Sequence, residues 1–163
     1  MLHLEPLDSA PQADSFTDRV IFQTPGWLSF ITASQKAEVV IAAVKDGQTT
    51  VGYFTGLIVE RYGFRVLGSP LPGWTTSFMG FNLAKGVSRR AAHEALFPYA
   101  YRVLKCSHVE VRDRYTTSDD LADTGWTWGE ASTHRIDLTP AEDALFGNMT
   151  SASITKSKAN AMA

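Results

Sequence analysis

The sequence has only one cysteine, Cys106, among its 163 residues, so an intramolecular disulfide is excluded. No apolar run approaches the roughly 18 residues that a membrane-spanning helix requires. The first residues also lack the basic stretch and apolar core of a secretory signal peptide. From these absences we expect a protein without a membrane span in a reducing compartment, the cytoplasm. Cys106 itself is expected to be a small buried hydrophobe.

A strong charge bias is also missing. The formal net charge is −2, whereas a dedicated nucleic-acid binder usually has a basic face, so the sequence carries no strong nucleic-acid signal. Hydrophobic residues make up 44% of the chain and charged residues 20%, as in an ordinary globular protein. The length fits one domain.

The histidines show no metal-ligand spacing. No two of them lie four residues apart, and no cysteine accompanies them, so we expect no metal site. The four are His3, His93, His108 and His134. His93 precedes Glu94 within a long amphipathic run, where we expect the two to form a pair on the helix surface.

The order of patterns along the chain predicts a mixed α+β fold. Proline introduces a short helix near Trp27, and three antiparallel strands follow, the first two joined by a hairpin turn at Asp46-Gly47. A long helix, a strand, a short helix capped by Ser118, and a hairpin complete the order. The expected strands are 38–45, 49–59, 64–67 and 109–112. The expected helix spans 87–104, with a kink or a break just before Pro98. The expected hairpin is 126–138, in which Trp126 and Trp128 share a face. The sheet should contain one parallel crossover around the long helix.

Three segments are expected from composition and punctuation. Residues 1–19 are polar and interrupted by proline, so they predict a flexible lead-in. The folded domain should span 20–138. A helical C-terminal segment, 139–163, should begin with Thr139 as N-cap and Pro140 in the first turn.

One candidate site is the turn that opens the long helix, Gly86, Val87, Ser88, Arg89 and Arg90. Backbone N–H groups at a helix start can hold a phosphate, and the two arginines would add positive charge. The same residues also fit a tight turn followed by two solvated arginines.

Two further segments predict a substrate site. The long loop 68–80 carries Trp74 and Phe78, which could line an acceptor pocket, or pack as a hydrophobic loop or against a second domain. Arg112, Arg114 and Tyr115 follow the end of a strand, where clefts of α/β sheets open and arginines can bind a carboxylate or phosphate. The charges of this second group could equally pair with one another at the surface.

These junctions resemble those of the GNAT (GCN5-related N-acetyltransferase) family. Its phosphate-binding turn reads Gln/Arg-x-x-Gly-x-Gly/Ala, and here Leu83, Gly86 and Ser88 stand at the three defined positions. A later family segment, Tyr-x-x-x-Gly-Phe, is similar to 121–126, where the tyrosine that often acts as general acid is replaced by Leu121. The resemblance implies a GNAT-like fold and acetyl-CoA, or another acyl-CoA, as cofactor at Gly86–Arg90. The catalytic residues stay unknown.

A nearer resemblance is to the FemAB-like and BioF2-like acyltransferases, which carry two GNAT-like domains in tandem. Residues 23–28 are similar to the segment that opens their first domain, and 136–146 resemble the junction between their domains. Only Lys156, Lys158 and Ala159 match the basic segment that should follow. This resemblance implies that 139–163 begins a second domain that the chain does not contain.

Three interpretations of function remain. The first is an acyltransferase domain that transfers an acyl or aminoacyl group to a small-molecule or peptide amine acceptor. The second is a non-catalytic GNAT-like half-domain that binds substrate or dimerises, with a second GNAT-like domain or another copy as partner. The third is a truncated product of a longer reading frame, suggested by the polar, small-residue segment 150–163.

Overall fold

The computed structural model describes residues 1–9, 16, 18–130 and 139–147. The chain divides into two units, Met1–Gly129 and Glu130–Ala163. Within the second unit the structure describes one short helix, α4 (Glu142–Gly147), which begins shortly after the predicted start at Thr139 and Pro140. Among the described helices, none is long and apolar enough to span a membrane.

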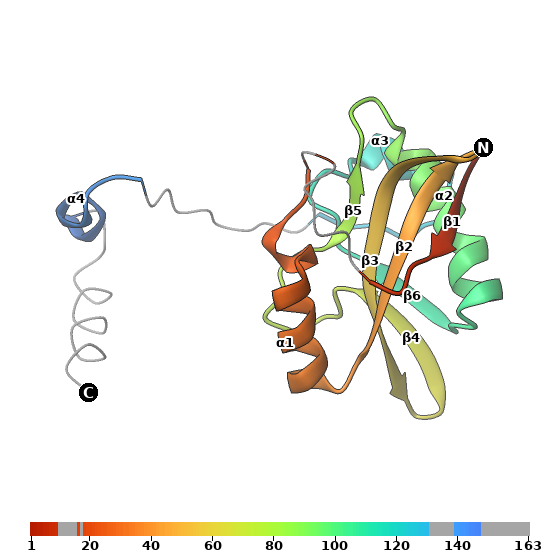
Figure 1. Cartoon of the computed structure of the whole chain (residues 1–163), viewed down its shortest axis with the longest axis horizontal. Helices are drawn as coiled ribbons and strands as arrows, with labels where there is room; N and C mark the ends of the chain where they lie inside the picture. The colour runs from red at the N-terminus through yellow and green to blue at the C-terminus, as the bar shows by residue number, and fades with distance from the viewer. Residues whose placement is uncertain (10–15, 17, 131–138, 148–163) are drawn as a thin grey trace. The chain divides into compact units, whose positions relative to one another are not determined.

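The first unit is built on one mixed sheet of six strands, as Figure 1 shows. The order is β1-β2-β3-β4-β6, with β5 beside β3. All the pairings are antiparallel except that of β4 with β6, which is parallel. The strands are β1 (Leu2–Pro6), β2 (Glu38–Asp46), β3 (Thr49–Arg61), β4 (Phe64–Ser69), β5 (Gly80–Leu83) and β6 (His108–Val111). The predicted mixed α+β fold, its hairpin at Asp46-Gly47 and its parallel crossover are confirmed.

The long strand β3 pairs with two strands in turn. Its C-terminal part, from Leu57, pairs with β4, and its N-terminal part, up to Thr55, pairs with β5. At the join, the Ser69 hydroxyl donates to the Thr55 carbonyl and accepts from the Gly80 amide (2.8 Å). The predicted loop is therefore the excursion 70–79, and its end forms a strand, β5, that the sequence patterns did not predict.

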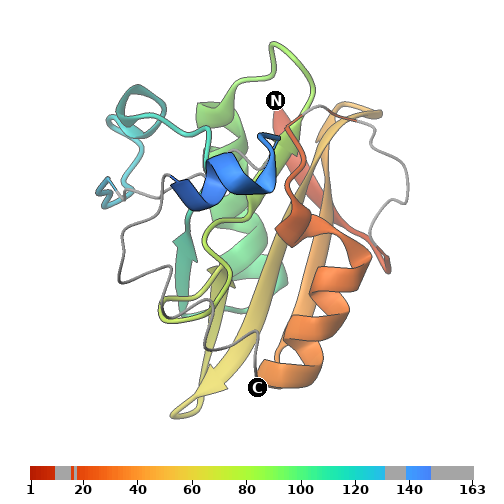
Figure 2. The same cartoon turned by 90° about the vertical axis from the view of Figure 1, so that its left-hand side faces the viewer.

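Two helices cover opposite faces of this sheet (Figures 1 and 2). Helix α1 (Pro25–Gln35) follows a 3₁₀ turn, η1 (Ile21–Gln23), and is capped by the Thr24 hydroxyl, which accepts from the Trp27 amide. Helix α2 (Arg89–Pro98) lies on the other face and continues into a π-helical turn, η2 (Tyr99–Val103). The break predicted just before Pro98 comes just after it, because proline ends the α-helical pattern but remains inside the last turn.

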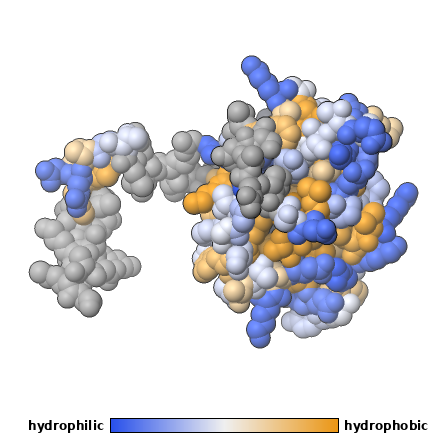
Figure 3. Space-filling view, viewed as in Figure 1, coloured by the Kyte–Doolittle hydropathy of each residue, from blue (hydrophilic) through white to orange (hydrophobic). Residues whose placement is uncertain are grey.

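The alternation of side chains along the strands produces two hydrophobic clusters, one on each face. Beneath α2 the cluster includes Phe54, Leu67 and Phe81, and beneath α1 it includes Ile41 and Leu57. Figure 3 shows that hydrophobic residues also reach the surface over the middle of the sheet beside α1, with hydrophilic residues around them. Cys106 is buried in the first cluster, as predicted.

The predicted flexible lead-in is wrong for its first residues. Residues Leu2–Pro6 form strand β1, which pairs antiparallel with β2 and buries Leu4 in the core. The apolar alternation of Leu2 and Leu4 is too short to stand out from its polar and proline neighbours, so only its pairing with β2 establishes the strand. Of the remaining lead-in, 10–15 and 17 lie outside the described residues.

Two predictions after β6 are also wrong. Helix α3 (Ser118–Leu121) is capped by Thr117, whose hydroxyl accepts from the Asp120 amide, and not by Ser118. Residues 126–130 form no strand, so Trp126 and Trp128 do not share a strand face. Trp126 instead packs on Phe97, with a ring-centroid distance of 4.6 Å, whereas Trp128 is exposed. The rest of the predicted hairpin, 131–138, lies outside the described residues.

Candidate functional site

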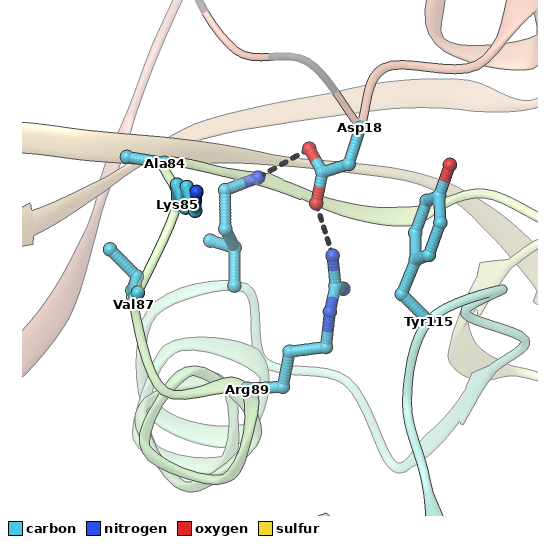
Figure 4. A pocket seen from close by; sticks show the side chains of 8 residues that line it. Asp18, Ala84, Lys85, Val87, Arg89 and Tyr115 are labelled. Carbon is cyan, nitrogen blue, oxygen red and sulfur yellow. Dashed lines mark hydrogen bonds and ion pairs between the residues drawn. The ribbon is translucent and has the colours of Figure 1, made fainter.

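A cavity of about 250 Å³ lies beside the turn between β5 and α2. It is lined by the turn residues 84–87 together with Asp18, Leu83, Arg89 and Tyr115. Figure 4 shows Asp18 and Arg89 pointing toward each other across this space, with Tyr115 alongside. The cavity thus brings together the predicted phosphate-binding turn and one predicted substrate-binding residue.

The turn has the geometry expected of a helix start. Gly86 has φ of +86°, in the left-handed region that glycine adopts without strain. The Val87 amide donates to the Ala84 carbonyl (3.2 Å), which closes the turn. Ser88 is the N-cap of α2, and its hydroxyl accepts from the Ala91 amide (3.2 Å). The amides of the first helical turn before Ala91 have no partner within the helix, which is the usual basis of anion binding at such ends.

Arg89 and Arg90, predicted together as phosphate contacts, have different environments. The Arg89 side chain is only 12% exposed, and its guanidinium forms an ion pair with Asp18. Its Nη1 atom also lies 2.8 Å from each oxygen of Asp113. Arg90 is half-buried and pairs with Glu94 (3.3 Å) one turn along the helix. Arg89 is therefore part of a buried ion network, and its charge is already balanced by protein carboxylates.

Asp113 is the most completely bonded member of this network. Its side chain is 1% exposed and, besides Arg89, accepts from the amides of Phe81 (2.8 Å), Tyr115 (2.8 Å) and Thr116 (3.2 Å). It also sits against Gly80, where a Cβ would lie 2.7 Å from that of Asp113. Asp113 thus ties the loop after β6 to the outer edge of β5.

Asp18 binds the same edge two residues further along. Its carboxylate accepts from the Leu83 amide (2.7 Å) and pairs with Arg89. Burial raises the pKa of this carboxyl above its ordinary value, and the charge of Asp113 acts in the same direction, against the opposing effect of Arg89. The outward amides of Phe81 and Leu83 are thereby both bonded to carboxylates.

Three of the five predicted substrate-binding residues contact one another, and one of them, Tyr115, lines the cavity. The Arg114 guanidinium stacks between the rings of Phe78 (5.6 Å to the centroid) and Tyr115 (5.4 Å), and Arg89 lies 5.1 Å from the Tyr115 centroid. We call Phe78, Arg114 and Tyr115 the stacked column. Such cation–π contacts order side chains that would otherwise move independently.

The other two predicted substrate-binding residues lie elsewhere. Trp74 packs against the cluster beneath α1, so it belongs to the hydrophobic packing of the loop. Arg112 is partly exposed and pairs with Glu110 (3.4 Å) on its own strand. Trp74 therefore belongs to a packed hydrophobic loop, and Arg112 forms a surface ion pair. These are the alternatives to substrate binding that the sequence left open for the two segments.

His93 is buried, which corrects the predicted surface pair with Glu94. Its side chain packs edge-on against Phe81 and Trp126, with centroid distances of 5.0 and 5.5 Å, because it lies on the inward face of α2. Its Nε2 atom hydrogen-bonds the Thr116 hydroxyl (2.8 Å), and its buried Nδ1 has no partner among the described residues. Burial lowers the pKa of this imidazole, and Arg89 adds to that effect while Asp113 opposes it.

Within the part of the chain that the structure describes, no three or more histidine, cysteine, aspartate or glutamate side chains could together hold a metal ion.

The Leu83 side chain is buried, and the Leu121 side chain is half-buried on α3. Neither of these two positions therefore presents a polar side chain to the cavity.

Neither Asp18 nor Asp113 was among the site residues predicted from the sequence. Asp113 had a local signal: an aspartate directly after a strand often accepts from the amide two residues on, as it does here from Tyr115. Asp18 had none, because its partners lie 65 and 71 residues further along the chain. In comparisons with known proteins, no family model, no curated protein and no solved structure matches the chain.

Proposed function

We propose that the first unit is a GNAT-like domain of the FemAB-like kind, an acyltransferase that transfers an acyl or aminoacyl group to an amine acceptor. The observation that carries this proposal is the cavity at the β5–α2 turn, where the start of α2 and Lys85 both lie. A helix start with an adjacent cation is a suitable seat for the phosphates of acetyl-CoA or another acyl-CoA.

The order of elements around that turn supports the GNAT-like assignment. Strands β1 to β4 pair antiparallel in sequence order, and β5 then leads through the turn into α2 and on to β6, which is parallel to β4. The turn residues Leu83, Gly86 and Ser88 stand where the resemblance places the phosphate-binding motif. A strand, a phosphate-binding turn, a crossover helix and a parallel strand are the unit that this resemblance requires.

The residues present fit a phosphate-bearing donor in part. Lys85 and the amides at the start of α2 would hold the phosphates, while Asp18 places a carboxylate in the same cavity. The stacked column would orient the acceptor, since an arginine held between two rings can bind a carboxylate of a small molecule or peptide. The contribution of the protein would be to hold the amine beside the acyl group, which replaces a bimolecular encounter with a bound geometry.

A second candidate function is a non-catalytic half-domain that binds substrate or dimerises. The observation that favours it is the balance of charge around Arg89, whose guanidinium is bonded to two carboxylates and therefore offers little to an incoming phosphate. Leu121, at the position where the family often has its acid, cannot donate a proton. In that case the partner would be a second GNAT-like domain or another copy of the chain.

Calorimetric titration and thermal unfolding with acetyl-CoA test the first proposal. We expect acetyl-CoA to raise the melting temperature of the full chain, because a ligand that binds only the folded state stabilises it. Lys85→Glu should weaken binding by about tenfold or more, as expected for loss of a charge-assisted contact and gain of a repulsive one. Lys105→Glu, an equal change of charge at an exposed residue that does not line the cavity, is the matched control.

Two outcomes would contradict the acyltransferase proposal. The first is the absence of heat and of any thermal shift at millimolar acetyl-CoA. The second is equal weakening by Lys85→Glu and Lys105→Glu, which would indicate unspecific attraction by net charge. A dimer seen by light scattering, together with no acetyl-CoA binding, would favour the non-catalytic half-domain.

A further inference from the structure

The buried ion network has an excess of negative charge. One guanidinium, that of Arg89, faces the two carboxylates of Asp18 and Asp113, all three with side chains at most 16% exposed. A buried carboxylate is stable only when its charge is compensated by partners. One of the two carboxylates is therefore held less well than the other.

The hydrogen bonds identify Asp18 as the weakly held one. Asp113 accepts from three backbone amides and receives Arg89 Nη1 on both oxygens, so its requirements are met without Asp18. Asp18 accepts from a single amide of another residue, that of Leu83, and from Arg89 Nη2. Burial raises the pKa of Asp18 in spite of the opposing effects of Arg89 and the Leu83 amide, and the nearby Asp113 charge adds to the rise.

Arg89 would stay in place without Asp18. Its Nη1 atom is bonded to Asp113, and its guanidinium lies 5.1 Å from the centroid of the Tyr115 ring. The Leu83 amide is fixed by β5, whose partner strand is β3. Two donors, the Leu83 amide and Arg89 Nη2, thus converge from rigid elements on the point now filled by the Asp18 carboxylate (Figure 4).

We propose that the Leu83 amide and Arg89 Nη2 form a binding site for a carboxylate or phosphate group of a ligand, and that Asp18 fills this site as an internal competitor when no ligand is bound. The proposal deepens the acyltransferase proposal and rests on it for the cavity being a donor site. Two oxygens of the ligand group take over the two hydrogen bonds, and the displaced Asp18 carboxylate regains water. The cavity of about 250 Å³ beside these donors leaves room for a group larger than a carboxylate.

An internal competitor lowers apparent affinity by the fraction of molecules in which the site is open. If Asp18 fills the site in nine molecules of ten, its removal raises the apparent affinity for an anion about tenfold. Asp18→Ala should therefore bind inorganic phosphate about tenfold more tightly than the unmodified chain. Asp8→Ala, which removes an exposed carboxylate from the same N-terminal region, should leave the affinity unchanged.

The titration is best followed by the amide resonances of the isotopically labelled full chain. We expect the Leu83 amide to shift on addition of phosphate in Asp18→Ala, since that amide exchanges solvent for a ligand oxygen. If Asp18→Ala does not fold, Asp18→Ser is used, because its shorter side chain loses the charge and leaves the Leu83 amide and Arg89 Nη2 open to a ligand. The corresponding control is then Asp8→Ser.

The proposal is overturned if the Asp18 variants bind phosphate no more tightly than the Asp8 variants, or if phosphate leaves the Leu83 amide unshifted. Failure of the acyltransferase proposal has a different signature. In that case phosphate affinity rises in Asp18→Ala, but acetyl-CoA binds neither the unmodified chain nor the variant. Equal acetyl-CoA binding by both would uphold the donor site and refute competition by Asp18.

Discussion

Asp113 connects three segments of the first unit through hydrogen bonds and an ion pair. It joins β5, the first turn of α2 and the loop after β6 through one carboxylate that is 1% exposed. This carboxylate accepts from a buried guanidinium and from three backbone amides, so its loss leaves the amides without their acceptor and leaves Arg89 paired with Asp18 alone of the two carboxylates.

Asp113→Asn is expected to lower the free energy of unfolding by about 3–5 kcal/mol, the usual cost of removing one partner from a buried ion pair. The NH₂ group of the asparagine would also point a donor at backbone N–H groups or at Arg89, which are donors themselves. Urea unfolding followed by circular dichroism measures the change. Asp119→Asn, at an exposed position of α3, should cost less than about 0.5 kcal/mol, and equal effects of the two changes would refute the structural role of Asp113.

His93 gives the molecule a pH dependence. Burial lowers the pKa of its imidazole, so the unfolded chain binds this proton more tightly than the folded one. Stability should therefore be complete above the ordinary histidine pKa of about 6.5 and fall as the pH drops below it. We expect His93→Gln to flatten the decline of melting temperature between about pH 7 and 5.

The control for this measurement is His108→Gln, which removes an exposed histidine and should leave the slope as it is. A His93→Gln variant that loses stability with acid as steeply as the unmodified chain would contradict the assignment. The offset between the variants at neutral pH reports the loss of the hydrogen bond to Thr116 and of the ring contacts with Phe81 and Trp126, and only the slope reports the titration.

At the scale of elements, the start of α2 and the turn before it form part of the cavity wall. Ser88→Ala removes the hydroxyl that accepts from the Ala91 amide, and should cost about 1 kcal/mol of unfolding free energy. Ser118→Ala, at a serine that the structure places after the N-cap of α3, should cost much less. Chemical denaturation of both variants measures the difference, and a larger cost at Ser118 would refute these cap assignments.

Elements whose signals are local could be predicted from the sequence. The Asp46-Gly47 turn and the helix after Pro25 are set by the conformational preferences of those residues, and both are present. Strands β1 and β5 were missed because each is short and exists only through pairing with β2 or β3. His93 was misplaced because the pairing pattern with Glu94 does not reveal which face of α2 meets the sheet.

The candidate site could be predicted only in part for the same reason. The turn at Gly86 has a local signal, and the structure places this turn in the wall of the cavity. The partners of Arg89 have no local signal in the sequence. Asp18 and Asp113 come from segments far from Arg89 in the chain and contact it only after the sheet has formed. Long-range ion pairs of this kind leave no periodic pattern in a sequence.

At the scale of the whole molecule, the described strands and both hydrophobic clusters lie within Met1–Gly129. We expect a chain shortened to residues 1–129 to unfold cooperatively, with near-ultraviolet circular dichroism from the packed Trp126 and Phe97 rings retained. Calorimetric and van't Hoff enthalpies that disagree, or loss of the near-ultraviolet signal, would show that residues beyond 129 are needed for folding.

The shared pairing of β3 with β4 and β5 has a consequence for how such a chain can diversify. Both strands are anchored to β3 separately, and the Ser69 hydroxyl closes the gap between them, so the sheet does not depend on the length of the excursion 70–79. Its exposed tip at Pro72 and Gly73 can accept insertions without a shift of strand register. A longer loop could therefore change which molecules have access to the stacked column, while the sheet keeps the same strand order and register.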